Sequence, residues 1–116
     1  MKRLEASNWI RRVATLTVSS NTYTPNVDSA DIAIISSPTA NFTIANPTGT
    51  PTDGQSLILR ITSSGTTYTP TWGTNYVGTS VSLPTTLVAS KTITVGFSYD
   101  ATAGKWVCLA ADTTGY

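Results

Sequence analysis

The sequence contains no histidine. Histidine is the side chain that proteins use most often as a general base and as a metal ligand near neutral pH. Its absence excludes serine–histidine and cysteine–histidine catalytic arrangements, together with the commonest kind of metal site. We therefore expect neither an enzyme nor a metal-dependent protein.

Cysteine is nearly absent as well, because Cys108 is the single one. A lone cysteine cannot form an internal disulfide, and this one lies among the apolar residues of "KWVCLAA". The context predicts a buried thiol that packs as a small hydrophobic side chain.

Long apolar runs are also missing. No stretch approaches the roughly 18 apolar residues of a membrane span. The N-terminus, "MKRLEASNWIRRVATL", begins with cations, but Glu5, Asn8, Arg11 and Arg12 interrupt the apolar centre that a signal peptide needs. We expect no export signal and a protein made in the cytoplasm.

The 116 residues, 40% of them hydrophobic, match the size and core of one domain. Short apolar segments alternate with turn residues, and only 11% of the residues are charged, a pattern typical of an all-β protein. Parallel sheets should need crossover helices, for which the chain has no room. We therefore predict a jelly-roll-like antiparallel β-sandwich of about eight strands, at 13–18, 31–36, 41–45, 56–62, 67–72, 80–83, 92–99 and 105–110. An immunoglobulin-type sandwich is the nearest alternative, but its paired cysteines are missing.

The stretch "PTGTPTDGQSLILRI" could at first be taken for a phosphate-binding loop. Such a loop needs a lysine and a hydroxyl at the start of a helix, whereas here a strand follows the glycines. Asp53–Gly54 is instead a strong turn pair. The strand after it should point Leu57, Leu59 and Ile61 to one side, and Ile58 and Arg60 to the other.

Charge is distributed unevenly. Residues 1–12 hold four cations and Glu5, a net charge of +3, whereas residues 13–116 hold three cations and five aspartates, a net charge of −2. We therefore divide the chain into a basic N-terminal arm, 1–12, and a β-sandwich domain, 13–116. Four cations are few for a nucleic-acid contact, so we expect a protein partner with an acidic surface.

The aspartates and aromatic residues each allow a second interpretation. Paired carboxylates could be catalytic or bind calcium, but Asp53 and Asp100 lie in turn motifs, and Asp28-x-x-Asp31 lacks the oxygen-ligand density of a calcium loop. The aromatic side chains could be a core or a set of stacking platforms for sugars, with Trp72, Tyr76 and Trp106 as glycan-contact candidates. We favour core packing, with Trp106 buried, and expect no catalytic, metal or cofactor site.

Three segments resemble a domain that recurs in virion proteins of tailed bacteriophages. They are "ADIAIISSPTANFTIANPTGTPTDGQSLILRI", "YTPTWGTNYVG" and "LPTTLVASKTITVGFSYDATAGKWVCLA", within roughly residues 22–111. That domain occurs in small head decoration or cement proteins and in head or tail fibres. The resemblance implies a jelly-roll sandwich that works as virion structure, usually as a homotrimer, without a cofactor.

The short basic arm, in place of a long fibre shaft, favours a capsid decoration or cement protein on the outer head surface. Its partners would be the major capsid protein and other copies of the chain, without nucleic acid or membrane. The capsid-contact candidates are Lys2, Arg3, Trp9, Arg11 and Arg12. The alternative is a head or tail fibre module that binds a host surface glycan.

Overall fold

The computed structural model describes residues 11–116, in which nine β strands form and no helix. The described part of the chain therefore has no helix that could cross a membrane. The strands are β1 (Val13–Thr15), β2 (Thr22–Tyr23), β3 (Ile32–Ser36), β4 (Phe42–Ile44), β5 (Ser56–Thr62), β6 (Pro70–Trp72), β7 (Tyr76–Val77), β8 (Thr92–Asp100) and β9 (Lys105–Asp112).

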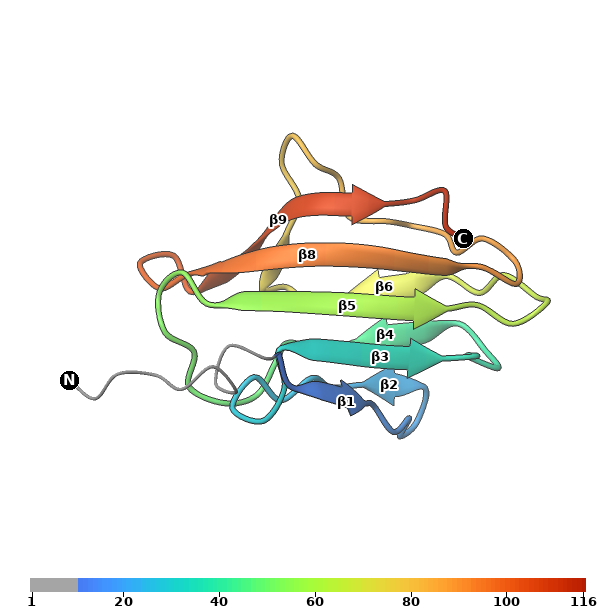
Figure 1. Cartoon of the computed structure of the whole chain (residues 1–116), viewed down its shortest axis with the longest axis horizontal. Helices are drawn as coiled ribbons and strands as arrows, with labels where there is room; N and C mark the ends of the chain where they lie inside the picture. The colour runs from blue at the N-terminus through green and yellow to red at the C-terminus, as the bar shows by residue number, and fades with distance from the viewer. Residues whose placement is uncertain (1–10) are drawn as a thin grey trace.

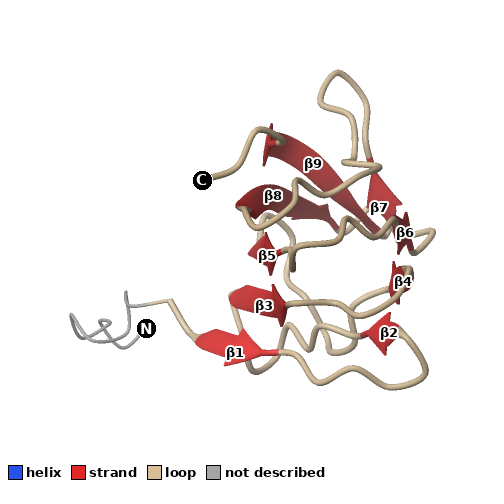
Figure 2. Ribbon diagram, turned by 90° about the vertical axis from the view of Figure 1, so that its right-hand side faces the viewer, coloured by secondary structure: helices blue, strands red, loops and turns tan. Residues whose placement is uncertain are grey.

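The strands form two sheets, seen in Figures 1 and 2. The larger has six strands in the order β1-β3-β5-β8-β9-β7, and the smaller has three in the order β2-β4-β6. The prediction of an all-β protein in two layers is confirmed. The prediction of a strand at 80–83 is wrong, because this segment is not a strand. The two-residue strands β2 and β7 were missed by the prediction.

The antiparallel jelly-roll topology is also wrong for most of the fold. Only β5–β8 and β8–β9 are antiparallel. The pairs β1–β3, β3–β5, β2–β4, β4–β6 and β7–β9 are parallel. From β1 to β6 the chain changes sheet after every strand, so neighbours within one sheet are two strands apart in sequence and run the same way. The intervening strand in the opposite sheet returns the chain to its starting end, the task that a crossover helix has in other parallel sheets. Parallel pairing therefore needs no helix here, and the lack of room for helices did not imply antiparallel sheets.

The core lies between the two sheets and follows the alternation of side chains along each strand. On β5, Leu57, Leu59 and Ile61 are fully buried, whereas Ile58 and Arg60 point to the outer face, as predicted. On β8 the inward residues Ile93, Val95 and Phe97 continue the same pattern. β5 and β8 thus supply the centre of the core.

The turn before β5 is confirmed. Gly54 has a φ of +82°, a conformation in which glycine has no Cβ to strain the backbone. The Gln55 amide donates to the Thr52 carbonyl at 3.0 Å, and the Gln55 side chain accepts from the Thr52 amide at 3.0 Å. The Gly54 amide donates to the Tyr99 carbonyl at 2.8 Å, which ties the turn to the end of β8. The segment "PTDGQ" is therefore a structural joint between two strands.

Candidate functional site

The basic arm is only partly within the described residues. Lys2, Arg3 and Trp9 lie outside them, as does most of the expected arm, 1–12. Of the predicted capsid-contact residues, the structure places Arg11 and Arg12, and both are exposed. They precede β1 at the edge of the six-stranded sheet, where the chain enters the domain.

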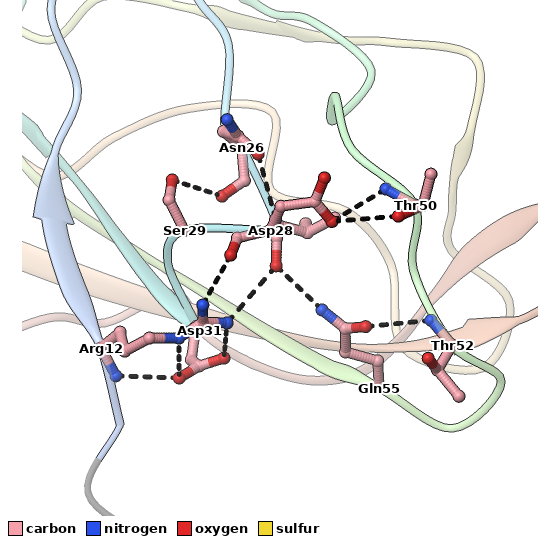
Figure 3. Close-up of polar contacts among 9 residues, drawn as sticks. Arg12, Asn26, Asp28, Ser29, Asp31, Thr50, Thr52 and Gln55 are labelled. Carbon is pink, nitrogen blue, oxygen red and sulfur yellow. Dashed lines mark hydrogen bonds and ion pairs between the residues drawn. The ribbon is translucent and has the colours of Figure 1, made fainter. Parts of the chain in front are cut away.

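Arg12 contacts the domain through both its side chain and its backbone amide, as drawn in Figure 3. Its Nη2 lies 3.1 Å from Asp31 Oδ1, its Nε donates to Asp31 Oδ2 at 3.3 Å, and its backbone amide donates to the same Oδ2 at 2.8 Å. Nη1 also donates to the Asp28 carbonyl at 2.6 Å. The hydrogen bond from the Arg12 side chain is the main reason why the pKa of Asp31 is lowered, and the same contact raises the pKa of Arg12.

These contacts separate the roles of the two arginines. The Arg12 guanidinium already has a carboxylate partner within its own chain, so its charge is less available to another protein. Its position suits it to fix where the arm leaves the sandwich. Arg11 has no such ion pair with any residue between 11 and 116. Arg12, which the prediction assigns to the arm, is therefore bound to the domain by these contacts.

The loop that Arg12 reaches is bound to a second loop. Asp28 Oδ1 accepts from the Thr50 amide at 2.9 Å, and Gln55 Nε2 donates to the Val27 carbonyl at 3.1 Å (Figure 3). The entry to β1, the loop before β3 and the loop before β5 are thus held in one hydrogen-bonded group. The sequence motif "PTGTPTDGQ" supplies one side of it.

The remaining aspartates within the described chain also accept backbone hydrogen bonds. Asp53 Oδ1 accepts from the Ala101 amide at 2.9 Å, across to the β8–β9 hairpin. Asp100 Oδ1 accepts from residues 102 and 103, and Asp112 Oδ1 from residues 114 and 115. All five aspartates between residues 11 and 116 thus have a structural partner. Over the same range there is no pocket and no cluster of three metal-binding side chains.

The three glycan-contact candidates lie in or against the core. Trp106 is 2% exposed and Tyr76 is 5% exposed, so neither ring has a free face on which a sugar could stack. The Tyr76 hydroxyl donates to the Ala45 carbonyl at 2.8 Å, and burial raises its pKa. Trp72 is partly buried, its centroid lies 5.2 Å from that of Tyr76, and its Nε1 donates to the Pro84 carbonyl at 2.7 Å. The prediction that Trp106 belongs to the core is confirmed.

Cys108 is buried, as predicted, and burial raises the pKa of its thiol. A raised pKa lowers the fraction of thiolate, the reactive form, so the structure favours an inert side chain. Its Sγ lies 3.7 Å from the Ala110 carbonyl, to which it donates a weak hydrogen bond.

Comparison with known proteins gives a likeness in fold alone. No protein-family model matches the sequence, and no curated protein is similar to it. A solved chain described as "Structure of a chaperone-substrate complex" superposes with a TM-score of 0.55 at 20% identity. The match covers 87% of this chain but 17% of the other, so the present chain spans about a sixth of that protein's length. The two-sheet fold therefore also occurs within a much longer polypeptide.

Proposed function

We propose that this chain is a structural protein of a bacteriophage virion that binds the outer surface of the head as a decoration or cement protein. The observation that supports this best is that the motifs that carry the resemblance have structural roles in the fold. "PTGTPTDGQ" and the hairpin "GFSYDATAGKW" are joined through Asp53 and Ala101, and their aspartates serve the backbone. Residues 11–116 are organised as a scaffold, with no cleft in which a substrate could be enclosed.

The arm remains the proposed capsid contact. Lys2, Arg3 and Arg11 would meet an acidic surface of the major capsid protein, with Trp9 as an apolar anchor, since arginine and aromatic residues often dominate interfaces. Arg12 would act differently: its pair with Asp31 would hold the arm in position. Copies of the chain would associate, as a homotrimer if the resemblance holds, so that several arms bind one head at once.

Co-sedimentation with undecorated heads tests this proposal. The full-length protein should sediment with heads, and a variant without residues 1–10 should bind more weakly while remaining folded, because the truncation leaves Arg12 and its contacts in place. Raising the salt concentration should weaken binding of the full-length protein more than that of the truncated one. Equal binding by both forms would remove the arm from the mechanism, and no binding by the full-length protein would refute the decoration role.

The fibre module is the second candidate, and one observation favours it: Trp72, one of the three predicted glycan contacts, is only partly buried. A glycan site would then have to use Trp72, the least buried of the three predicted contacts, because Tyr76 and Trp106 are enclosed. Binding to a glycan array that is lost in Trp72→Ala would support this role. The absence of any glycan signal would leave the decoration protein as the better proposal.

A further inference from the structure

The Asp53–Gly54 pair is a chemically reactive point in the main chain. An aspartate rearranges most readily when a glycine follows it, because the next amide nitrogen then reaches the side-chain carboxyl carbon without a Cβ in the way. Of the five aspartates between residues 11 and 116, Asp53 alone precedes a glycine. Both residues are exposed, so water can reach them. The turn before β5 therefore contains a candidate site of covalent modification.

The rearrangement has two steps and needs only water. In the first, the Gly54 nitrogen bonds to Cγ of Asp53, and one carboxyl oxygen leaves as water with the amide proton and the proton of the acid. In the second, water adds to the main-chain carbonyl carbon of Asp53, the bond from that carbon to the Gly54 nitrogen breaks, and the nitrogen regains a proton. The product is isoaspartate, in which the main chain passes through Cβ and Cγ and is one carbon longer. The former carbonyl carbon becomes a free carboxyl group.

The folded structure opposes the first step at both reacting groups. The Gly54 amide donates to the Tyr99 carbonyl at 2.8 Å, so the proton that has to leave is held in a hydrogen bond. Asp53 Oδ1 accepts from the Ala101 amide at 2.9 Å, which directs the carboxyl group to the β8–β9 hairpin. Both hydrogen bonds must break before the nitrogen can bond to Cγ.

These two hydrogen bonds continue a central ladder of the fold. The Tyr99 amide donates to the Gln55 carbonyl at 2.8 Å, and the next residues, Ser56 and Ser98, are paired between β5 and β8. To release the reactive pair, the turn has to separate from the end of that ladder. Such a local opening is a minor population of a native protein. In the unfolded chain neither reacting group is held, and chemical modification proceeds there.

We propose that Asp53–Gly54 is a site of isoaspartate formation that is protected in the folded protein and reacts only when the turn separates from the β8–β9 hairpin. The product keeps the turn apart from the hairpin, because the added carbon displaces the Gly54 amide from the Tyr99 carbonyl. A transient opening thus becomes permanent when the rearrangement occurs during it. The inference is independent of the proposed function, since it involves only residues of the domain and water.

Peptide mapping by mass spectrometry, with electron-transfer fragmentation to distinguish isoaspartate from aspartate, measures the reaction over time. Residue 53 should rearrange at least roughly ten-fold more slowly in the folded protein than in urea at the same pH and temperature. In urea, Gly54→Ala should suppress the reaction, because the added Cβ hinders the attack. Equal rates in the folded and unfolded protein would overturn the protection by the fold. A lack of isoaspartate at residue 53 in urea would remove the site.

Ala101→Pro tests the contact that holds the Asp53 carboxyl group, because proline has no amide proton. Ala101 is exposed, its φ is not positive, and Asp100 before it is in strand β8, a conformation that suits the residue before a proline. The folded variant should form isoaspartate roughly five-fold faster than the wild type, the factor for one ordinary hydrogen bond. Ala101→Ser keeps the amide and is the matched control. An unchanged rate in Ala101→Pro would refute the role of this contact.

The modified protein gives a second measurement. After separation from the unmodified form, it should have a Tm lower by roughly 4 °C, as expected when a domain of this size loses about one hydrogen bond. A modified form with the wild-type Tm would refute the claim that the product keeps the turn apart from the hairpin.

Discussion

Trp106→Ala should remove a large part of the stability of the domain. The indole is 2% exposed, and its centroid lies 4.9 Å from that of Tyr99, so the substitution deletes a buried ring and one ring–ring contact. Truncation of a buried aromatic residue to alanine costs about 3–5 kcal/mol, since transfer and cavity terms add. For a domain of this size each kcal/mol corresponds to a shift in Tm of about 4 °C or more, so the Tm should fall by roughly 12–20 °C.

Urea unfolding followed by circular dichroism measures this loss. The midpoint should fall while the slope m stays near its wild-type value, because the surface exposed on unfolding hardly changes. Leu109→Ala is the control: Leu109 is on the same strand but 63% exposed, and its truncation should cost less than about 0.5 kcal/mol. Trp106→Phe keeps a ring in the cavity and should lose less stability than Trp106→Ala. The phenylalanine variant can therefore still be measured if the alanine variant does not fold. A loss below about 1 kcal/mol for Trp106→Ala would refute the packing argument.

Two further predictions concern the joints around the sandwich. Gly54→Ala should lower the free energy of unfolding in urea by about 1 kcal/mol: a Cβ at Gly54 meets no atom within 4 Å, so only the left-handed φ of +82° opposes the substitution. The control is Gly65→Ala, at a site equally open but without a positive φ, which should be close to neutral. Equal losses at the two glycines would contradict this explanation. The ion pair of Arg12 with Asp31 should add to stability above the pKa of Asp31 in the unfolded chain, about 3.9, and the contribution should vanish as the pH falls through its lower pKa in the folded protein. Asp31→Asn should therefore destabilise the protein slightly at pH 7 and hardly at all near pH 2, and a difference from wild type that is independent of pH would count against the pair.

The sequence predicted the strands of the core better than the way in which they are connected. Alternation along 56–62 and 92–99 identifies β5 and β8 and the side of each that is buried, because one face of a strand must be apolar to pack on the other sheet. The direction of pairing has no such local signal. The sequence of a turn such as "PTDGQ" is compatible with a chain that returns beside the previous strand and equally with one that crosses to the opposite sheet. The two-residue strands β2 and β7 are too short to show a period.

The candidate sites show the same limit. The burial of Trp106 could be predicted from its apolar neighbours, but the pairing of Arg12 with Asp31 joins residues 19 apart and has no sequence signal. The outward row of Val13, Ile32 and Ile58 was equally hidden, since it arises only when parallel pairing aligns these three residues. Contacts that depend on topology could not be inferred while the topology itself was wrong.

The attachment of β1 has a mechanical consequence. β1 is an edge strand of three residues, paired within the described chain to β3 alone, and the ion pair of Arg12 with Asp31 lies at its start. A force applied to the chain at Arg12 would load that ion pair and the short β1–β3 ladder before any other strand. β5, β8 and β9 form the longer central ladders and would remain under little tension. Under load the domain would thus yield at its entry by a local opening of β1, while the sandwich behind it stays folded.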